Sequence, residues 1–147
     1  MPTGLRVQRT ILKVLTESKV DGIICELGSG WGTLALGIAR AYPDCRVVGF
    51  ENSPVPFWVS QVLCRIMPTP NMKVERRDFY DIPLRDVDLV ICYLYSGAME
   101  RLREKFEVEL ESGTSVISHT FAIPGWEPEQ VIAVRDLYRT KIYVYRI

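Results

Sequence analysis

The sequence has no excess of either charge. Its 147 residues include 18 Lys and Arg and 18 Asp and Glu, which gives a formal net charge of zero. A domain whose main partner is the phosphate backbone of a nucleic acid usually carries a basic excess or a basic patch. The balanced composition therefore argues against a nucleic-acid partner, and we expect none.

Histidines and closely spaced cysteines are also scarce. His119 is the single histidine, and the four cysteines show no Cys-x-x-Cys spacing. Zinc sites draw on such residues, so we expect no metal site. Scattered cysteines inside apolar runs are typical of reduced proteins, which predicts a cytoplasmic location.

Long apolar runs are missing as well. None reaches the ~18 residues that a membrane span requires. Arg6, Arg9 and Lys13 interrupt the apolar residues near the start, so this stretch does not have the pattern of a signal peptide. The length is sufficient for one domain and too short for two. We therefore expect a single domain over residues 1–147 with no membrane span.

Short apolar runs alternate with helical patterns through most of the chain. The expected strands are at 22–25, 46–50, 72–75, 87–92 and 113–118, and the expected helices at 5–18, 33–42, 57–67 and 98–110. Residues 131–138 and 141–147 are β-rich and are joined by a polar turn near Arg139 and Thr140, which predicts a hairpin. The pattern predicts an α/β fold: a Rossmann-like, seven-stranded, mostly parallel sheet with helices on both faces and a C-terminal antiparallel β-hairpin.

A glycine-rich loop, ICELGSGWGT at residues 24–33, connects the first strand to a helix. Such a loop lets a ligand lie against bare backbone and points helix N–H groups at it. No Gly-Lys-Ser/Thr follows, which excludes a P-loop. A dinucleotide loop would have its third glycine at Thr33, whereas this chain has it at Gly32. Glu26 would also repel a pyrophosphate, so the loop favours a ligand with an amino group or a cationic centre.

Acidic residues follow the next two strands. Glu51 ends the second strand, 23 positions after Gly28, where a carboxylate can accept hydrogen bonds from both hydroxyls of a ribose. Asp78 follows the third strand and is placed to accept from an adenine amino group, with Phe79 beside the ring. The carboxyl ends of parallel strands meet at one edge, so these acids converge. S-adenosylmethionine meets these demands and is the predicted cofactor.

These segments together carry a family resemblance. The motifs E-L-G-S-G-W-G, G-F-E-N-S-P and R-D-F, on this strand pattern, resemble the class I (seven-β-strand) methyltransferases that use S-adenosylmethionine. The resemblance covers nearly the whole chain and implies a set of cofactor-binding residues. They are Glu26, Gly28, Ser29, Gly30, Gly32, Glu51, Asn52, Asp78, Phe79 and Tyr93.

A narrower resemblance is found in three later segments. Asp78-Phe79-Tyr80, Tyr93-Leu94-Tyr95-Ser96 and Pro124-Gly125-Trp126 are similar to motifs of a small protein-lysine methyltransferase family, that of the mitochondrial ATP synthase c-subunit type, which has compact prokaryotic relatives. Ser96 replaces the usual proline. The resemblance implies N-methylation of a protein lysine. Eukaryotic members carry an N-terminal membrane segment that this chain lacks, so a membrane location does not follow.

Aromatic residues near the active edge are the candidates for the substrate pocket. We expect Tyr93 and Tyr95 to form one wall facing the methyl group, because alternation along a strand points both rings to the same side. Ordinary half-buried aromatics are an equal alternative. Trp126, beyond the fifth strand, is expected to contact substrate. No residue is required as a general base, although Asp81 is conceivable.

The other aromatic residues are assigned structural roles. Trp31 is expected either to lie against the cofactor or to cap the core, and Trp58 either to lie in the core or to form an exposed docking face. The core is favoured for both, since tryptophan is heavily buried on average. His119 is expected to be a hydrogen-bonded structural residue.

Short connections between the strands leave no room for a lid. About ten residues separate strands three and four, and no full helix fits between strands five and six. An open active face suits a protruding protein lysine. The alternatives are a methyltransferase acting on a small molecule or on RNA, and a non-catalytic subunit that binds S-adenosylmethionine. An oxidoreductase comes last because of the glycine spacing.

Overall fold

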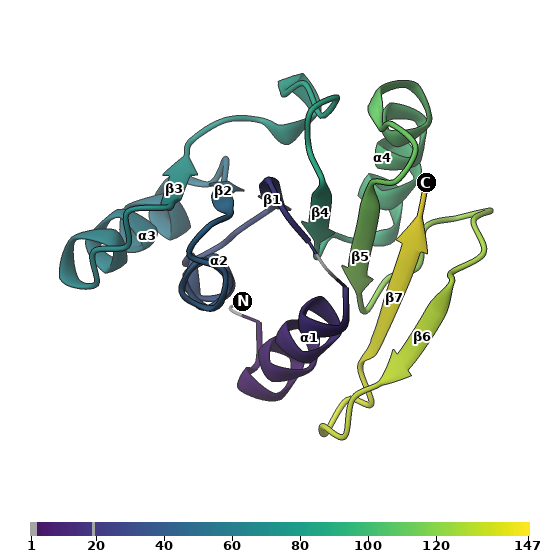
Figure 1. The fold of residues 1–147 in the computed structure, drawn as a ribbon, viewed down its shortest axis with the longest axis horizontal. Helices are drawn as coiled ribbons and strands as arrows, with labels where there is room; N and C mark the ends of the chain where they lie inside the picture. Colours follow the sequence, from purple (N-terminus) through teal and green to yellow (C-terminus); the bar gives the residue numbers. More distant parts are fainter. Residues whose placement is uncertain (1–2, 19) are drawn as a thin grey trace.

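A computed structural model describes residues 3–18 and 20–147. Within these residues seven strands form one sheet in the order β3-β2-β1-β4-β5-β7-β6 (Figure 1). The strands are β1 Ile23–Leu27, β2 Arg46–Phe50, β3 Met72–Glu75, β4 Leu89–Cys92, β5 Ser115–His119, β6 Gln130–Ala133 and β7 Lys141–Arg146. The first five run parallel, and β7 lies antiparallel between β5 and β6. The predicted mixed sheet with its terminal hairpin is confirmed.

Helices cover both faces of the sheet, as predicted. They are α1 Leu5–Glu17, α2 Thr33–Ala41, α3 Pro54–Ile66 and α4 Ser96–Glu109, with a 3₁₀ turn, η1, at Phe79–Asp81. The first two pack on one face and α4 on the other, while α3 lies beside β3 at the end of the sheet (Figure 1). No helix in the described part of the chain has both the length and the apolar character needed to cross a bilayer.

The central strands are apolar because both of their faces are covered. All four residues of β4 are buried. Leu89 and Ile91 face the core formed with α1 and α2, whereas Val90 and Cys92 face the core formed with α4. Such strands appear in the sequence as short continuous apolar runs, which is why they could be predicted.

Most predicted boundaries agree with the structure within two residues, and two differ by more. The third helix begins at Pro54 rather than at residue 57, because proline is tolerated in the first turn, where its missing N–H has no intrahelical partner. Strand β6 ends at Ala133, so residues 134–140 form a longer turn than expected, and the strand-like Leu137 and Tyr138 lie within it.

The prediction that Trp58 lies in the core is wrong. Its side chain is 64% exposed, and Val55, Val62 and Ile66 on the same helix are exposed as well. Ser60 is the buried residue of α3. The sheet ends at β3, so nothing in the described residues lies over the outer face of this helix.

Candidate functional site

A cavity of about 400 Å³ lies at the carboxyl ends of β1, β2 and β4. The strand order reverses here, because β2 and β3 lie on one side of β1 whereas β4 and the later strands lie on the other side. Ligands of open α/β sheets bind at such a switch point. Seven of the predicted site residues line the cavity, namely Gly28, Gly30, Glu51, Asn52, Phe79, Tyr93 and Tyr95.

The glycine loop has a backbone that other residues rarely adopt. Gly28, Gly30 and Gly32 have φ values of +75°, +57° and +84°. A Cβ atom at Gly30 would meet no other atom within 4 Å, so this position presents bare backbone to the open side. Gly32 is the N-cap of α2, and a Cβ there would come within 3.2 Å of the Ser60 Cβ. The loop therefore combines ligand access with close packing of α2 and α3.

Glu51 joins the glycine loop to the start of α3. Its Oε2 accepts from the Gly30 N–H at 2.8 Å and its Oε1 from the Ser53 N–H at 2.9 Å. An ionised carboxylate offers about four acceptor positions, so about two stay available for ligand hydroxyls. Glu51 is thus held rigidly at the cavity wall in an orientation suited to a ribose diol.

Glu26 lies beneath the glycine loop at the end of β1. The residue is only 5% exposed, and its Oε2 has no hydrogen-bond partner among the described residues. Burial raises the pKa of this carboxyl from 4.5 to about 8, against the opposing effect of a hydrogen bond with the Ala35 backbone. Glu26 does not itself line the cavity. A buried carboxyl with one unpaired oxygen matches a ligand that brings an amino group.

The segment after β3 places Phe79 in the cavity wall, whereas the Asp78 side chain bonds to the backbone of the adjacent 3₁₀ turn. Asp78 Oδ1 accepts from the Tyr80 N–H at 3.0 Å and so caps η1. Its side chain does not line the cavity, whereas Phe79 and Tyr80 do. The contact of Asp78 with an adenine amino group stays a prediction. Asp81 is exposed and does not line the cavity either.

Tyr93 and Tyr95 share the cavity wall, although for a different reason than strand alternation. Strand β4 ends at Cys92, so both tyrosines lie in the loop that leads to α4. The Tyr93 ring stacks on His119 at a centroid distance of 4.1 Å and an interplanar angle of 19°. Tyr95 is 70% exposed. The two rings form the boundary of the cavity on the β4 side.

His119 is buried and hydrogen-bonded, as expected. Its ring nitrogens lie 3.4 Å from Thr3 Oγ1 and 3.3 Å from Thr120 Oγ1. Burial lowers the pKa of the imidazole to about 4, so the ring behind Tyr93 is neutral at physiological pH.

Trp126 is not part of the cavity lining, and its contact with substrate stays a prediction. The indole packs against Phe106 and Tyr145 at centroid distances of 6.2 and 5.9 Å, and its Nε1 donates to Glu107 Oε1 at 3.2 Å. These partners belong to the layer of α4 and β7. The loop after β5 folds back onto α4, which the sequence did not indicate.

Trp31 takes the less favoured of its two expected positions. It is 46% exposed and lines the cavity instead of the core. Ser29 and Gly32 belong to the loop but are not part of the lining. Pro56, Leu94 and Ala98 line it without having been predicted, and their signal was their position next to the predicted motifs.

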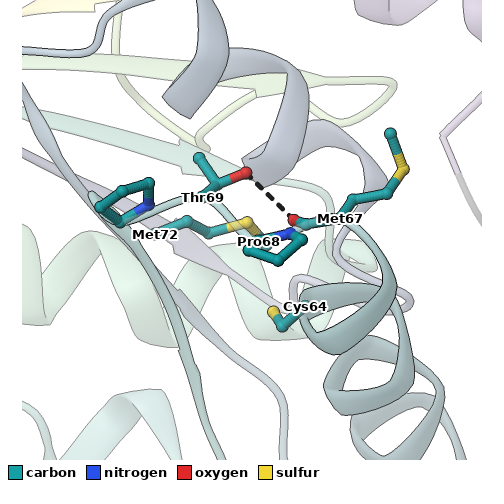
Figure 2. A pocket seen from close by; sticks show the side chains of 6 residues that line it. Cys64, Met67, Pro68, Thr69 and Met72 are labelled. Atoms are coloured by element: carbon teal, nitrogen blue, oxygen red, sulfur yellow. Dashed lines mark hydrogen bonds between the residues drawn. The ribbon is translucent and has the colours of Figure 1, made fainter.

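A different cavity, of about 350 Å³, lies between the end of α3 and β3 (Figure 2). Its lining is Cys64, Met67, Pro68, Thr69, Pro70 and Met72. Thr69 Oγ1 donates to the Met67 carbonyl at 3.2 Å (Figure 2). No charged side chain from the described part of the chain lines this cavity, so it does not offer the acids that an amino group and a ribose require.

Comparisons with known proteins agree with this geometry. The sequence model of the ANTKMT methyltransferase domain matches residues 26–130. A protein-lysine N-methyltransferase of Saccharolobus islandicus (strain REY15A) is 30% identical over 139 residues, covering 92% of this chain and 84% of that protein. The mouse lysine N-methyltransferase of the ATP synthase c-subunit is 28% identical over 130 residues, or 88% of this chain, which spans about half (51%) of that relative.

A solved structure shares the whole fold. An RNA methyltransferase from Salinibacter ruber, in complex with S-adenosyl-L-homocysteine, aligns with a TM-score of 0.87 at 24% identity. The alignment covers 100% of this chain and 94% of the other. At this identity the likeness concerns the fold and not the acceptor.

Proposed function

This chain belongs to the ANTKMT methyltransferase domain family, and on that premise we propose that it methylates the side-chain amine of a lysine in a protein. It is an S-adenosylmethionine-dependent methyltransferase with a Rossmann-like fold. The resemblance read from the sequence motifs is thereby confirmed at the level of the family. The observation that supports a lysine acceptor best is the aromatic, nearly uncharged wall around the place where the acceptor must enter.

The residues at the cavity fit the cofactor. Glu51 would hold the ribose hydroxyls, and the bare backbone at Gly30 lets the ligand approach closely. The unpaired Oε2 of Glu26 matches the amino group, and Phe79 offers an apolar surface to the adenine. When bound, the cofactor supplies a methyl group on a positively charged sulfur.

The acceptor side of the cavity favours an uncharged amine. A lysine is nucleophilic only after it has lost its proton, and removal from water lowers the pKa of an ammonium group. Tyr93, Tyr95 and Leu94 line this side, and they exclude water without adding charge. The chain's main contributions are then to align the amine with the methyl group and to keep the site dry.

Deprotonation does not require a residue of the cavity as general base. Glu51 is the one acidic residue that lines the cavity among the described residues, and its acceptor positions are used by Gly30, Ser53 and the ribose hydroxyls of the bound cofactor. We therefore propose that the amine loses its proton to solvent on entry. The rate of methyl transfer should rise with pH until the lysine is neutral in solution.

The cellular location is part of the same proposal. All four cysteines are unpaired, and three of them are buried. This state supports a reducing, cytoplasmic environment.

The experiment that tests the function uses cofactor labelled on its methyl group. The purified chain is incubated with an unfractionated cell lysate, and protein is separated from RNA and small molecules. Acid hydrolysis of the protein should release labelled methyllysine, and Glu51→Ala, which removes the ribose-binding carboxylate, should release far less. Label confined to RNA or to the small-molecule fraction would contradict the lysine proposal.

A further inference from the structure

A third cavity, of about 430 Å³, opens beside the cofactor cavity, and Tyr93 lines both. Its other walls come from residues 3–7 at the start of α1, from the end of β5 at His119 and Thr120, and from the β6–β7 turn. We infer that this acceptor groove binds an extended protein segment that carries the target lysine next to an apolar side chain. The inference rests on the proposed function and adds to it a place and a sequence preference.

The acceptor groove lies at the same edge of the sheet as the cofactor cavity. Strand β7 pairs antiparallel with β5, with Ile142 opposite His119, so the β6–β7 turn lies at the carboxyl edge of the parallel strands. Gln8 Nε2 donates to the Thr3 carbonyl at 2.8 Å and to Thr33 Oγ1 at 3.1 Å. These bonds hold the N-terminal wall of the groove against the start of α2, directly after the glycine loop.

Arg6 is the one positively charged side chain that lines the groove among the described residues, and the wall beside Tyr93 is aromatic. The neutral His119 ring stacks on Tyr93, and the Phe121 ring also stacks with Tyr93, at a centroid distance of 6.5 Å. The guanidinium of Arg6 is engaged by the Arg135 carbonyl, which ties α1 to the β6–β7 turn. A side chain passing along Tyr93 thus meets aromatic and hydroxyl groups until it reaches the cofactor cavity.

Acidic charge is held at the groove by Asp136. Its Oδ1 accepts from the Thr140 N–H at 2.8 Å and its Oδ2 from Thr140 Oγ1 at 2.6 Å. These bonds lower the pKa of the carboxyl, so it stays ionised. The charge favours the approach of a cationic segment, before the lysine loses its proton to solvent on entering the cofactor cavity.

The rim of the groove is apolar and uncovered. Leu5, Leu137 and Tyr138 line it and are 72%, 89% and 84% exposed. Exposed apolar side chains that gather around one opening mark a docking surface for another molecule. A small metabolite seated at Tyr93 would leave these side chains in water, whereas a polypeptide running along the groove would cover them. The occupant that uses both the rim and the opening to the cofactor cavity is a protein segment.

The test compares two short synthetic peptides that differ only beside the lysine, one with leucine and one with serine on each side. The chain is used as wild type, as the groove variant Leu137→Ser/Tyr138→Ser, and as the matched control Trp58→Ser/Val62→Ser, whose positions are 64% and 55% exposed on α3. We expect wild type and control to prefer the leucine peptide in kcat/KM by about tenfold, and the groove variant to lose this preference. The affinity of all three for S-adenosylhomocysteine, measured by calorimetry, should agree within about twofold.

A photo-reactive leucine peptide locates the contact independently of turnover. Bound to the chain in the presence of S-adenosylhomocysteine, it should cross-link to residues 3–7 or 136–140. Cross-links only elsewhere, or none, would overturn the acceptor groove, as would a groove variant that keeps the preference or a control that loses it. If the wild type labels lysines of lysate proteins but treats both peptides alike, the groove inference fails alone. If it labels no lysine while S-adenosylhomocysteine binds, the proposed function itself fails.

Discussion

Replacing Glu26 with glutamine removes a buried titrating group and should change how stability depends on pH. The carboxyl has an ordinary pKa of 4.5 and a pKa of about 8 in the folded chain, because burial disfavours its charge. A raised carboxyl pKa means that the unfolded chain releases this proton at lower pH than the folded chain does. The stability that the folded chain gains by keeping Glu26 protonated is therefore fully present below pH 4.5 and is lost as the pH rises toward 8.

The magnitude follows from the two pKa values. Ionisation of Glu26 in the unfolded chain should cost wild-type stability about 1 kcal/mol at pH 5 and about 3 kcal/mol at pH 7. Near pH 9 the loss approaches its limit of about 5 kcal/mol, which is the gap between 4.5 and about 8 at about 1.36 kcal/mol for each pKa unit. Glu26→Gln keeps the shape and does not titrate, so it escapes this loss.

Urea denaturation of both proteins between pH 5 and pH 9 measures the effect. The difference in unfolding free energy between Glu26→Gln and wild type should grow with pH in favour of the variant. A constant difference, or one that grows in favour of wild type, would refute the assignment of a buried neutral carboxyl. Other groups, His119 included, titrate in both proteins and cancel in the difference.

The same reasoning extends to the cofactor. If Glu26 must ionise to pair with the amino group of the ligand, binding releases a proton. The affinity of wild type for S-adenosylhomocysteine should then rise by up to about tenfold for each pH unit between 6 and 8. Glu26→Gln should bind more weakly at pH 8, with little pH dependence. Calorimetry in buffers of different ionisation enthalpy would detect the proton, and its absence would contradict the pairing.

Three further predictions concern single side chains. Glu51→Ala should weaken S-adenosylhomocysteine binding on the order of 10- to 100-fold, because charge-assisted hydrogen bonds to the ligand are lost. The circular dichroism spectrum of the variant should stay native. Unchanged affinity by calorimetry would disprove the role of Glu51 in binding the ribose. His119 has a lowered pKa of about 4, so its contribution to stability is present above pH 6.5 and is lost as the pH falls toward 4. The loss in unfolding free energy, measured by urea titration, should be about 3 kcal/mol. His119→Gln should remove that part of the pH dependence. Trp58→Ser should change the free energy of unfolding by less than about 0.5 kcal/mol. Trp126→Ala should lower it by about 3 kcal/mol or more and leave cofactor affinity intact. A larger loss of stability for Trp58→Ser than for Trp126→Ala would contradict the placement of the two indoles.

The sequence alone was sufficient for the strands, the glycine loop and the acid at the end of β2. These features are local. Buried parallel strands are continuous apolar runs, and three positive φ angles within five residues require glycines at Gly28, Gly30 and Gly32. Glu51 could be placed because the carboxyl ends of adjacent parallel strands always meet at one edge.

The tertiary structure alone decided where the large aromatic side chains lie and what surrounds the site. Trp58 is exposed because the sheet ends at β3, and Trp126 is in the α4 layer because the loop after β5 folds back. The acceptor groove joins residues near both ends of the chain through Tyr93, a proximity that no periodicity records. Local pattern determines which backbone a segment adopts, but burial of a side chain depends on which distant element lies over it.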